Sequence, residues 1–76
     1  HHGKHEAIAA LHQVIGLTPD DTNAYYQLGE LLSSIGEYAQ AEKVYKRLAL
    51  INPADPIAQA KATAMAALRE GQLANG

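Results

Sequence analysis

Residues 22–55 read TNAYYQLGELLSSIGEYAQAEKVYKRLALINPAD, and the second half of this stretch echoes an earlier part of the chain. The two copies lie 34 residues apart and keep the same order of apolar, proline and acidic positions. The matched residues are Ala7, Leu11, Leu17, Pro19 and Asp21 in the first copy and Ala41, Tyr45, Ile51, Pro53 and Asp55 in the second. Self-similarity at a fixed period of this size is typical of stacked helical hairpins, because each unit repeats the same contacts with its neighbour. The repeat therefore predicts an all-α fold.

Apolar spacing and capping residues predict four helices, at about residues 4–17, 22–35, 38–51 and 56–69. Asp21 is a good N-cap, Asp55 followed by Pro56 is a second start signal, and Gly36 suits the left-handed position after a helix. The short connections predict that successive helices pack antiparallel. Gly29 shares the buried face of the second helix, where it indicates the close approach of another helix.

The third predicted helix is amphipathic. Its buried positions are predicted to be Tyr38, Ala41, Val44, Tyr45 and Leu48. The charged residues on the rest of its surface are Glu42, Lys43, Lys46 and Arg47. These four side chains are predicted to face water as a solvated surface.

Within the complete period, the order of residues resembles a tetratricopeptide repeat. Helix A of that family carries an aromatic residue, a Leu-Gly pair and a large residue, matched here by Tyr25, Leu28, Gly29 and Leu32. Helix B carries an Ala, an aromatic residue and a proline, matched by Ala41, Tyr45 and Pro53. The resemblance implies about four helices in antiparallel hairpins, stacked as a right-handed superhelix, an α-α solenoid. It also implies that Gly29 and Ala41 permit close approach of helices A and B.

The resemblance divides the chain into parts. Residues 1–3 are interpreted as the remnant of an affinity tag, because two histidines precede a glycine. One domain is predicted over residues 4–76. Its parts are half a repeat with helix B at 4–21, a complete repeat at 22–55, and a degenerate helix A or capping helix at 56–76.

The last part is eroded at the positions that define helix A. Gln59, Ala62, Thr63 and Ala66 stand where the family has an aromatic residue, Leu, Gly and a large residue. Residues 71–74 echo residues 36–39 and are predicted to be the entrance to another helix B. Two interpretations stay open: a piece cut from a longer array, or a fourth helix that caps the array. Because this helix is apolar on nearly all sides, we expect a missing helix, a second copy or a ligand to cover it.

In families of this kind, the A helices line a concave surface that holds ligands. The resemblance therefore implies a peptide-binding groove formed by Asn23, Tyr26, Gln27, Glu30, Ser33, Ile57, Lys61, Ala64 and Leu68. The core does not need Tyr26, so this residue is either a ligand contact or a packing contact with a neighbouring helix. Lys61 is the only basic residue in the set, which argues against a basic clamp for a C-terminal carboxylate.

Composition and motifs argue against several other functions. The net charge is −2 and no cluster of Lys and Arg could follow a phosphate backbone, so nucleic acid is not an expected partner. No apolar run approaches the roughly 20 residues that span a bilayer, so membrane insertion is not expected. Without Cys, a phosphate-binding loop or a Ser-His-acid set, we predict neither an enzyme nor a cofactor. His5 and His12 lie two turns apart rather than one, so they are predicted to be surface residues and not metal ligands.

The leading hypothesis is a protein-interaction scaffold whose groove binds a peptide or a helix of a partner protein. The alternative is a self-associating segment, in which the apolar fourth helix of one copy completes the array of another to give a homo-oligomer. A third interpretation, a helical module attached to an enzyme, depends on flanking sequence. The compartment stays open, because the lack of Cys fits the cytoplasm and the periplasm equally.

Overall fold

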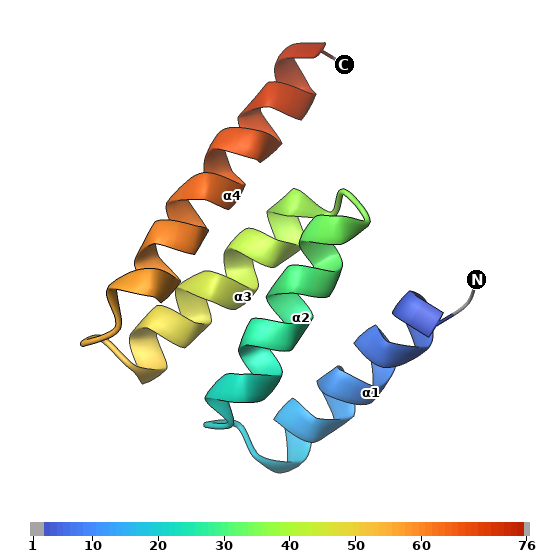
Figure 1. Cartoon of the computed structure of the whole chain (residues 1–76), viewed down its shortest axis with the longest axis vertical. Helices are drawn as coiled ribbons and strands as arrows, with labels where there is room; N and C mark the ends of the chain where they lie inside the picture. The colour runs from blue at the N-terminus through green and yellow to red at the C-terminus, as the bar shows by residue number, and fades with distance from the viewer. Residues whose placement is uncertain (1–2, 76) are drawn as a thin grey trace.

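The computed structural model describes residues 3–75, and the side chains of residues 3–73. This part of the chain forms four helices: α1 (Gly3–Leu17), α2 (Thr22–Ser34), α3 (Tyr38–Ile51) and α4 (Pro56–Asn75). Each helix packs against the next in chain order, and successive helices run in opposite directions (Figure 1). The assembly is flat, with Cα extents of 37 × 35 × 14 Å. The prediction of an all-α array of antiparallel hairpins is confirmed.

The predicted helix bounds agree closely with the structure at the first three helices. α3 begins and ends where it was expected, α1 begins one residue earlier, and α2 ends one residue earlier. Gly3, assigned to the tag remnant, is the first residue of α1, whereas the two histidines before it lie outside the described residues. The division of the chain into a tag, a half repeat, a complete repeat and a degenerate unit stays a prediction.

Capping residues define the ends of the helices as the sequence indicates. The Asp21 carboxylate accepts a hydrogen bond from the backbone N–H of Ala24 at 3.2 Å, and Asp55 Oδ1 accepts one from Ile57 at 2.9 Å. Each carboxylate therefore satisfies one of the N–H groups that a helix start leaves without a partner. Gly36 has a φ of 82°, and Glu37 donates its N–H to the Leu32 carbonyl across this residue at 2.9 Å. This arrangement is a Schellman motif, which requires the left-handed conformation that glycine adopts at least cost.

α4 differs from its prediction. It was expected to end at about residue 69 and to be followed by a turn into another helix, but it continues through Gly71 to Asn75. Among the described residues, Gly36 is the only glycine with a positive φ, so Gly71 does not make the reversal that Gly36 makes. The chain reverses direction after α2, and α3 packs back against α2. No described helix packs back against α4 in this way. The extension is held instead by Gln72, whose Nε2 donates to the Gly36 carbonyl at 2.9 Å.

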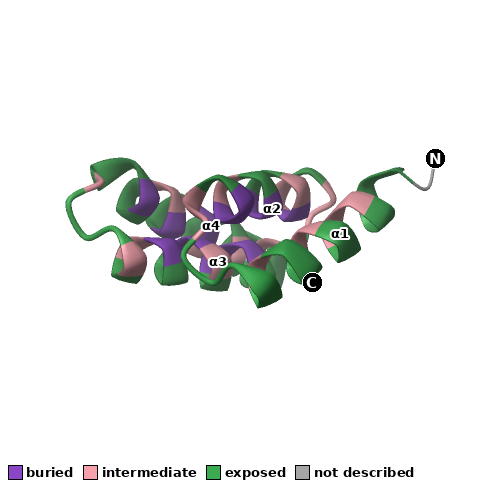
Figure 2. Cartoon of the chain, turned by 90° about the horizontal axis from the view of Figure 1, so that it is seen from below, coloured by how far each residue is buried: buried purple, intermediate pink, exposed green. Residues whose placement is uncertain are grey.

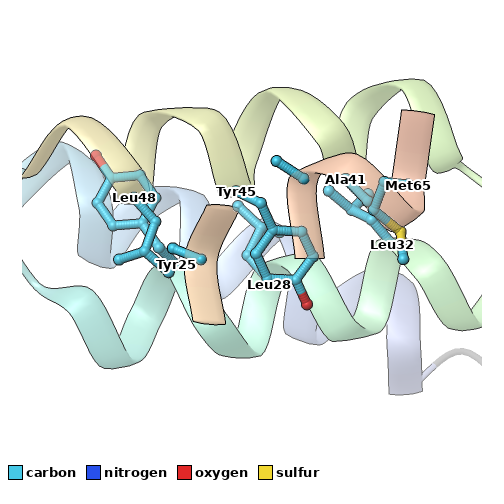
Figure 3. Packing of buried hydrophobic residues seen from close by; sticks show 9 residues of the cluster. Tyr25, Leu28, Leu32, Ala41, Tyr45, Leu48 and Met65 are labelled. Atoms are coloured by element: carbon cyan, nitrogen blue, oxygen red, sulfur yellow. The ribbon is translucent and has the colours of Figure 1, made fainter. Parts of the chain in front are cut away.

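The hydrophobic core lies where α2, α3 and α4 meet, and Figure 2 shows the buried positions between these helices. α1 has intermediate and exposed positions but no buried one, and the last turn of α4 in the figure is exposed. The core residues are Tyr25, Leu28, Leu32, Ala41, Tyr45, Leu48, Ala58, Ala62 and Met65. Leu48 lies beside Tyr25, and Ala41 lies near Leu32 and Met65 (Figure 3). Tyr38 and Val44 were predicted to be buried, but they pack half-buried at the edge of this core because α3 is covered mainly on its Ala41, Tyr45 and Leu48 side.

Gly29 lies directly beneath the ring of Tyr45. A Cβ atom on Gly29 would stand 2.5 Å from Tyr45 Cζ and 2.8 Å from both Cε atoms. Real Cβ atoms do not approach another carbon so closely, because such a contact is strongly repulsive. The prediction that Gly29 permits close helix approach is therefore confirmed, and the group that packs against Gly29 is the ring of Tyr45.

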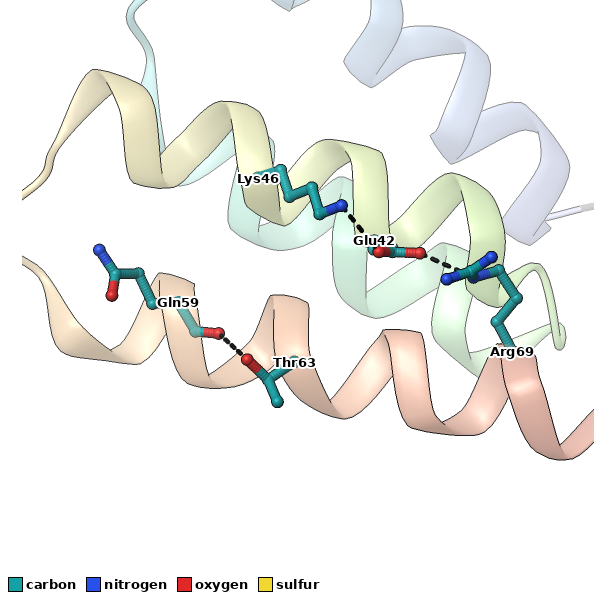
Figure 4. A network of polar contacts seen from close by, with 5 residues as sticks. All are labelled: Glu42, Lys46, Gln59, Thr63 and Arg69. Carbon is teal, nitrogen blue, oxygen red and sulfur yellow. Dashed lines mark hydrogen bonds and ion pairs between the residues drawn. The ribbon is translucent and has the colours of Figure 1, made fainter.

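Glu42 is a correction to the sequence analysis. It was predicted to face water, yet it is only 7% exposed. Lys46 Nζ lies 2.9 Å from Glu42 Oε2, and Arg69 Nε of α4 lies 2.8 Å from Oε1 (Figure 4). The hydrogen bond from Lys46, together with the charges of Arg69 and Lys46, lowers the pKa of Glu42, although burial acts in the opposite direction. Lys43, Lys46 and Arg47 are exposed as predicted, and Glu42 alone is covered, because Arg69 of α4 packs against it.

Candidate peptide-binding surface

The predicted groove residues all lie at the surface of the A helices, α2 and α4. On α2, Asn23, Gln27 and Glu30 are exposed, while Tyr26 and Ser33 are half-buried. On α4, the exposed members are Ile57, Ala64 and Leu68, and Lys61 is half-buried. None of the nine residues belongs to the buried core, so all of them are accessible to a ligand.

The α4 members of the set share one face of the helix. Ile57, Lys61, Ala64 and Leu68 are spaced by four, three and four residues, which is the spacing of neighbours along a helix surface. Ile57 is 56% exposed and Leu68 is 44% exposed. This face, called the α4 strip below, therefore presents two large apolar side chains to solvent with a lysine between them.

Tyr26 makes a specific contact that the sequence analysis did not assign. Its hydroxyl donates a hydrogen bond to Asp55 Oδ2 at the start of α4, and its ring centroid lies 6.3 Å from that of Tyr45 at an interplanar angle of 59°. The hydrogen bond to Asp55, burial and the negative charge of Asp55 together raise the pKa of Tyr26 to about 12. The packing alternative for Tyr26 thus has direct support, because the side chain connects α2 to the α3–α4 turn.

Two of the predicted residues meet in a hollow of about 420 Å³ between α1 and α2. Its lining residues are Lys4, Gln27, Glu30, Leu31 and Ser34. Lys4 comes from α1, which the sequence analysis left out of the binding surface. The 34-residue period could have indicated its position, because it relates Lys4 to Tyr38, which packs at the edge of the core. This cavity is called the front hollow below.

A second hollow, of about 450 Å³, lies between α3 and α4. Its lining residues are Lys46, Ala49, Leu50, Gln59, Ala62 and Thr63. Figure 4 shows Lys46 on α3 and Gln59 and Thr63 on α4; the Thr63 hydroxyl donates to the Gln59 carbonyl at 3.1 Å. None of these residues was assigned to a binding site from the sequence. This cavity is called the α3–α4 slot below.

The described residues form neither a metal-binding cluster nor a membrane-spanning helix. Within residues 3–75, no three His, Cys, Asp or Glu side chains gather as a metal ion requires. His5 and His12 are both exposed on α1. Over the same residues, no helix combines the length and the apolar character that crossing a membrane requires.

Comparisons with known proteins agree with this architecture. The family model described as tetratricopeptide repeat matches residues 5–68. Superkiller protein 3 of Schizosaccharomyces pombe (strain 972 / ATCC 24843) is 35% identical over 51 residues, which are 67% of this chain and 4% of that protein. No solved structure matches the chain.

The chain therefore belongs to the tetratricopeptide repeat family. Members of this family generally serve as protein–protein interaction modules and are typically not catalytic. The chain spans only a small fraction of the relative named above, so that protein's own role is not carried over to it.

Proposed function

We propose that this chain is an interaction scaffold that binds a peptide or a helix of a partner protein along the A-helix surface of α2 and α4. The observation that supports the proposal best is the α4 strip. A partner segment with apolar side chains at helical spacing would bury Ile57 and Leu68 and leave its polar face toward water. Burial of exposed apolar area is the main source of affinity in contacts of this kind.

Residues of α2 supply the polar side of the proposed surface. Asn23, Gln27 and Glu30 are exposed and offer amide and carboxylate groups to a partner's backbone or side chains. Glu30 disfavours an anionic segment in this place, so a neutral or basic partner fits better. The proposal therefore describes a partner with an apolar stripe and no cluster of acidic residues.

Tyr26 has a different role in this proposal from Gln27 and Glu30. Because its hydroxyl already donates to Asp55, it offers a partner its ring rather than a hydrogen-bond donor. The same contact holds the α3–α4 turn against α2. We therefore propose that Tyr26 orients α4 relative to α2 and contacts the partner only through ring carbons.

Selection of a displayed peptide library on the chain, followed by NMR titration with a selected peptide, tests the proposal. The expected result is amide shifts at Gln27, Glu30, Lys61 and Leu68. Ile57→Glu is expected to weaken binding about tenfold or more, since a charge on the apolar strip must lose its hydration when the peptide binds. Leu50→Glu is the matched control, because Leu50 is also exposed but lies in the α3–α4 slot.

Shifts limited to the outer faces of α1 and α3 would contradict the groove proposal, as would equal losses of affinity in the two variants. The proposal gives the chain no catalytic role and no nucleic-acid partner. The net charge of −2 supports the second point, because it offers no attraction to phosphates.

A further inference from the structure

The face of α4 that corresponds to the most deeply packed face of α2 is open. In α2, Tyr25, Leu28 and Gly29 are buried beneath α3. The residues 34 positions later are Gln59, Ala62 and Thr63, of which Gln59 and Thr63 are exposed. The same helix face is therefore core in one repeat and surface in the next.

The α3–α4 slot is the repeat equivalent of the place where α3 packs. Subtracting 34 from its six lining residues gives His12, Ile15, Gly16, Tyr25, Leu28 and Gly29. In the structure, α3 occupies this earlier position. The remaining space there is a hollow of about 300 Å³ lined by residues of α1, α2 and α3. The slot thus lies where a helix packs in the preceding repeat. It is lined by α3 and α4 alone, whereas the equivalent hollow is lined by α1, α2 and the packed helix α3.

α1 carries a face that matches the one by which α3 packs. Ala41, Tyr45 and Leu48 are the residues of α3 that are wholly buried, and 34 residues earlier stand Ala7, Leu11 and Val14. None of the residues of α1 is buried, and Val14 is 38% exposed. Ala7 and Leu11 are half-buried, and Leu11 packs at the edge of the core of its own copy. The molecule therefore presents a helix of the B type whose apolar face is only partly covered and, elsewhere, an open position for such a helix.

The sizes of the side chains match α1 to the slot and exclude α3. Tyr45 packs on Gly29, where a Cβ atom would stand 2.5 Å from its ring. The slot has Thr63 in place of Gly29, so a helix with a tyrosine at this point would collide with the Thr63 side chain. α1 has Leu11 at this point. Within a copy, the small Gly29 faces the large Tyr45; between copies, Thr63 would face Leu11, and these two side chains are both of intermediate size.

We propose that the α3–α4 slot of one copy binds α1 of a second copy, in the orientation in which α3 packs on α2 within a copy. Leu11 of the second copy lies against Thr63, and Val14 lies near Gln59. Leu50, which is 78% exposed, is covered at the edge of the contact. The slot is lined by none of the groove residues, whereas the front hollow, which the same contact covers, is lined in part by Gln27 and Glu30 of the groove.

The front hollow is covered by the same contact. Its residues Lys4 and Leu31 correspond to Tyr38 and Met65, which lie at the edge of and within the core to which α2, the preceding A helix, contributes Tyr25, Leu28 and Leu32. When α1 of the second copy occupies the slot, α4 of the first copy takes the matching position beside Lys4 and Leu31. One contact thus fills open surfaces on both partners.

This contact joins different surfaces of the two copies, so it does not close on itself. Each added copy leaves one free slot and one free α1 face at the ends of the assembly. Self-association is therefore expected to continue beyond a dimer as the concentration rises. A symmetric dimer through the slot alone would stop at two copies.

Sedimentation velocity of the 76-residue chain over a range of concentrations is the first test. The expected result is a size distribution that grows with concentration. Val14→Glu and Leu50→Glu are each expected to raise the dissociation constant at least tenfold, because each places a charge in the apolar contact. Circular dichroism verifies that both variants keep their helical content, and Ile57→Glu on the α4 strip serves as a control that leaves association unchanged.

Mixing the two variants is the decisive test. The Val14→Glu copy keeps a normal slot and the Leu50→Glu copy keeps a normal α1 face, so the mixture should form a heterodimer although each variant alone stays monomeric. Failure of the mixture to associate would overturn the proposal, as would a parent chain that is monomeric at every concentration. A monomeric chain that binds a selected peptide in a Leu50-dependent way would instead assign the slot to another protein.

Discussion

α2 and α4 occupy the same place in successive repeats, yet they are buried to very different degrees. The four repeat-defining positions of α2 are Tyr25, Leu28, Gly29 and Leu32, and all of them are buried. The corresponding positions of α4 are Gln59, Ala62, Thr63 and Ala66, of which only Ala62 is buried, at 8% exposure. α2 is packed on both sides, by α1 and α3, whereas α4 packs against α3.

This difference shows that the consensus residues of helix A are those that pack against a neighbouring helix B. A large aromatic residue and a glycine stabilise helix A only when a helix B packs against them. The aromatic ring fills the space between the two helices, and the glycine leaves room for a side chain of helix B. On α4, where no described helix covers the face, small and polar residues cost less, and the helix continues through Gly71 without a turn.

The largest expected effect distinguishes the buried helix from the exposed one. Leu28→Ala should cost about 2–5 kcal/mol of unfolding free energy, because Leu28 is fully buried and its loss leaves a cavity. In so small a domain, whose total stability is of similar size, this variant should be largely unfolded. Leu68→Ala on α4 should cost less than about 1 kcal/mol, because the side chain is half exposed. Urea denaturation measures both, and equal losses would remove the distinction.

The second prediction concerns the same repeat position in the two helices. Gly29→Ala gains helix propensity of about 1 kcal/mol but forces the buried Tyr45 ring to move, so a net loss of about 1–2 kcal/mol is expected. Thr63→Ala should instead gain a few tenths of a kcal/mol, because Thr63 is exposed and Ala is the better helix former. Thermal unfolding of the two variants should show melting temperatures shifted in opposite directions. A stabilised Gly29→Ala would show that the ring moves freely.

The third prediction compares the N-caps of the two helices. Asp21→Ala should cost about 1 kcal/mol, the usual value for loss of a capping carboxylate. Asp55→Ala should cost more, because Asp55 caps α4 and also accepts the hydrogen bond from Tyr26. In the Tyr26→Phe background, the two substitutions should become equal in cost. Denaturant titration of the two single N-cap variants, of Tyr26→Phe and of the two double variants checks this, and an excess cost of Asp55→Ala that survives in Tyr26→Phe would contradict the assignment.

The contact between Tyr26 and Asp55 also predicts a loss of stability in alkali. The pKa of Tyr26 is raised in the folded chain from the ordinary value of 10.0 to about 12. The contribution is therefore complete below pH 10 and is lost as the pH rises through 12. NMR of the tyrosine-labelled chain should find that the side chain of Tyr26 stays protonated to about pH 12, and Tyr26→Phe should remove that signal and flatten the fall in stability.

The smallest expected effect is on the ion pair that holds α4 against α3. Because the folded chain lowers the pKa of Glu42 below its ordinary value of 4.5, the contribution of this residue is complete above pH 4.5. It is lost as the pH falls through the lowered value, when the carboxylate gains a proton. Glu42→Gln should reduce the acid dependence of the melting temperature. Equal acid profiles for the parent and Glu42→Gln would contradict the role of the pair.

Much of the fold could be predicted because its signals are local. Asp21, Gly36 and Asp55 act on backbone groups within a few residues, so their effect does not depend on the rest of the molecule. The path of α4 could not be predicted, because a turn at Gly71 depends on whether another helix folds back there. Glu42 was misplaced for a similar reason: only the packing of α4 brings Arg69 to it.

The candidate site was predictable in part. The helix face that remains after the core is assigned contains the nine groove residues, of which six are exposed and Tyr26, Ser33 and Lys61 are half-buried. The bond between Tyr26 and Asp55 joins residues that are 29 positions apart, so no periodicity within one helix could have indicated it. Binding in the groove itself stays a prediction.

The amino-acid sequence by itself determined the period, the family and the order of the helices, because these depend on repeated spacing and on local caps. Only the tertiary structure decided which repeated positions are core and which are surface. It placed Thr63 at the edge of an open slot although Gly29, at the same repeat position, lies beneath a tyrosine ring. The physical reason is that burial belongs to a pair of helices: a residue is buried only where a second element removes it from water.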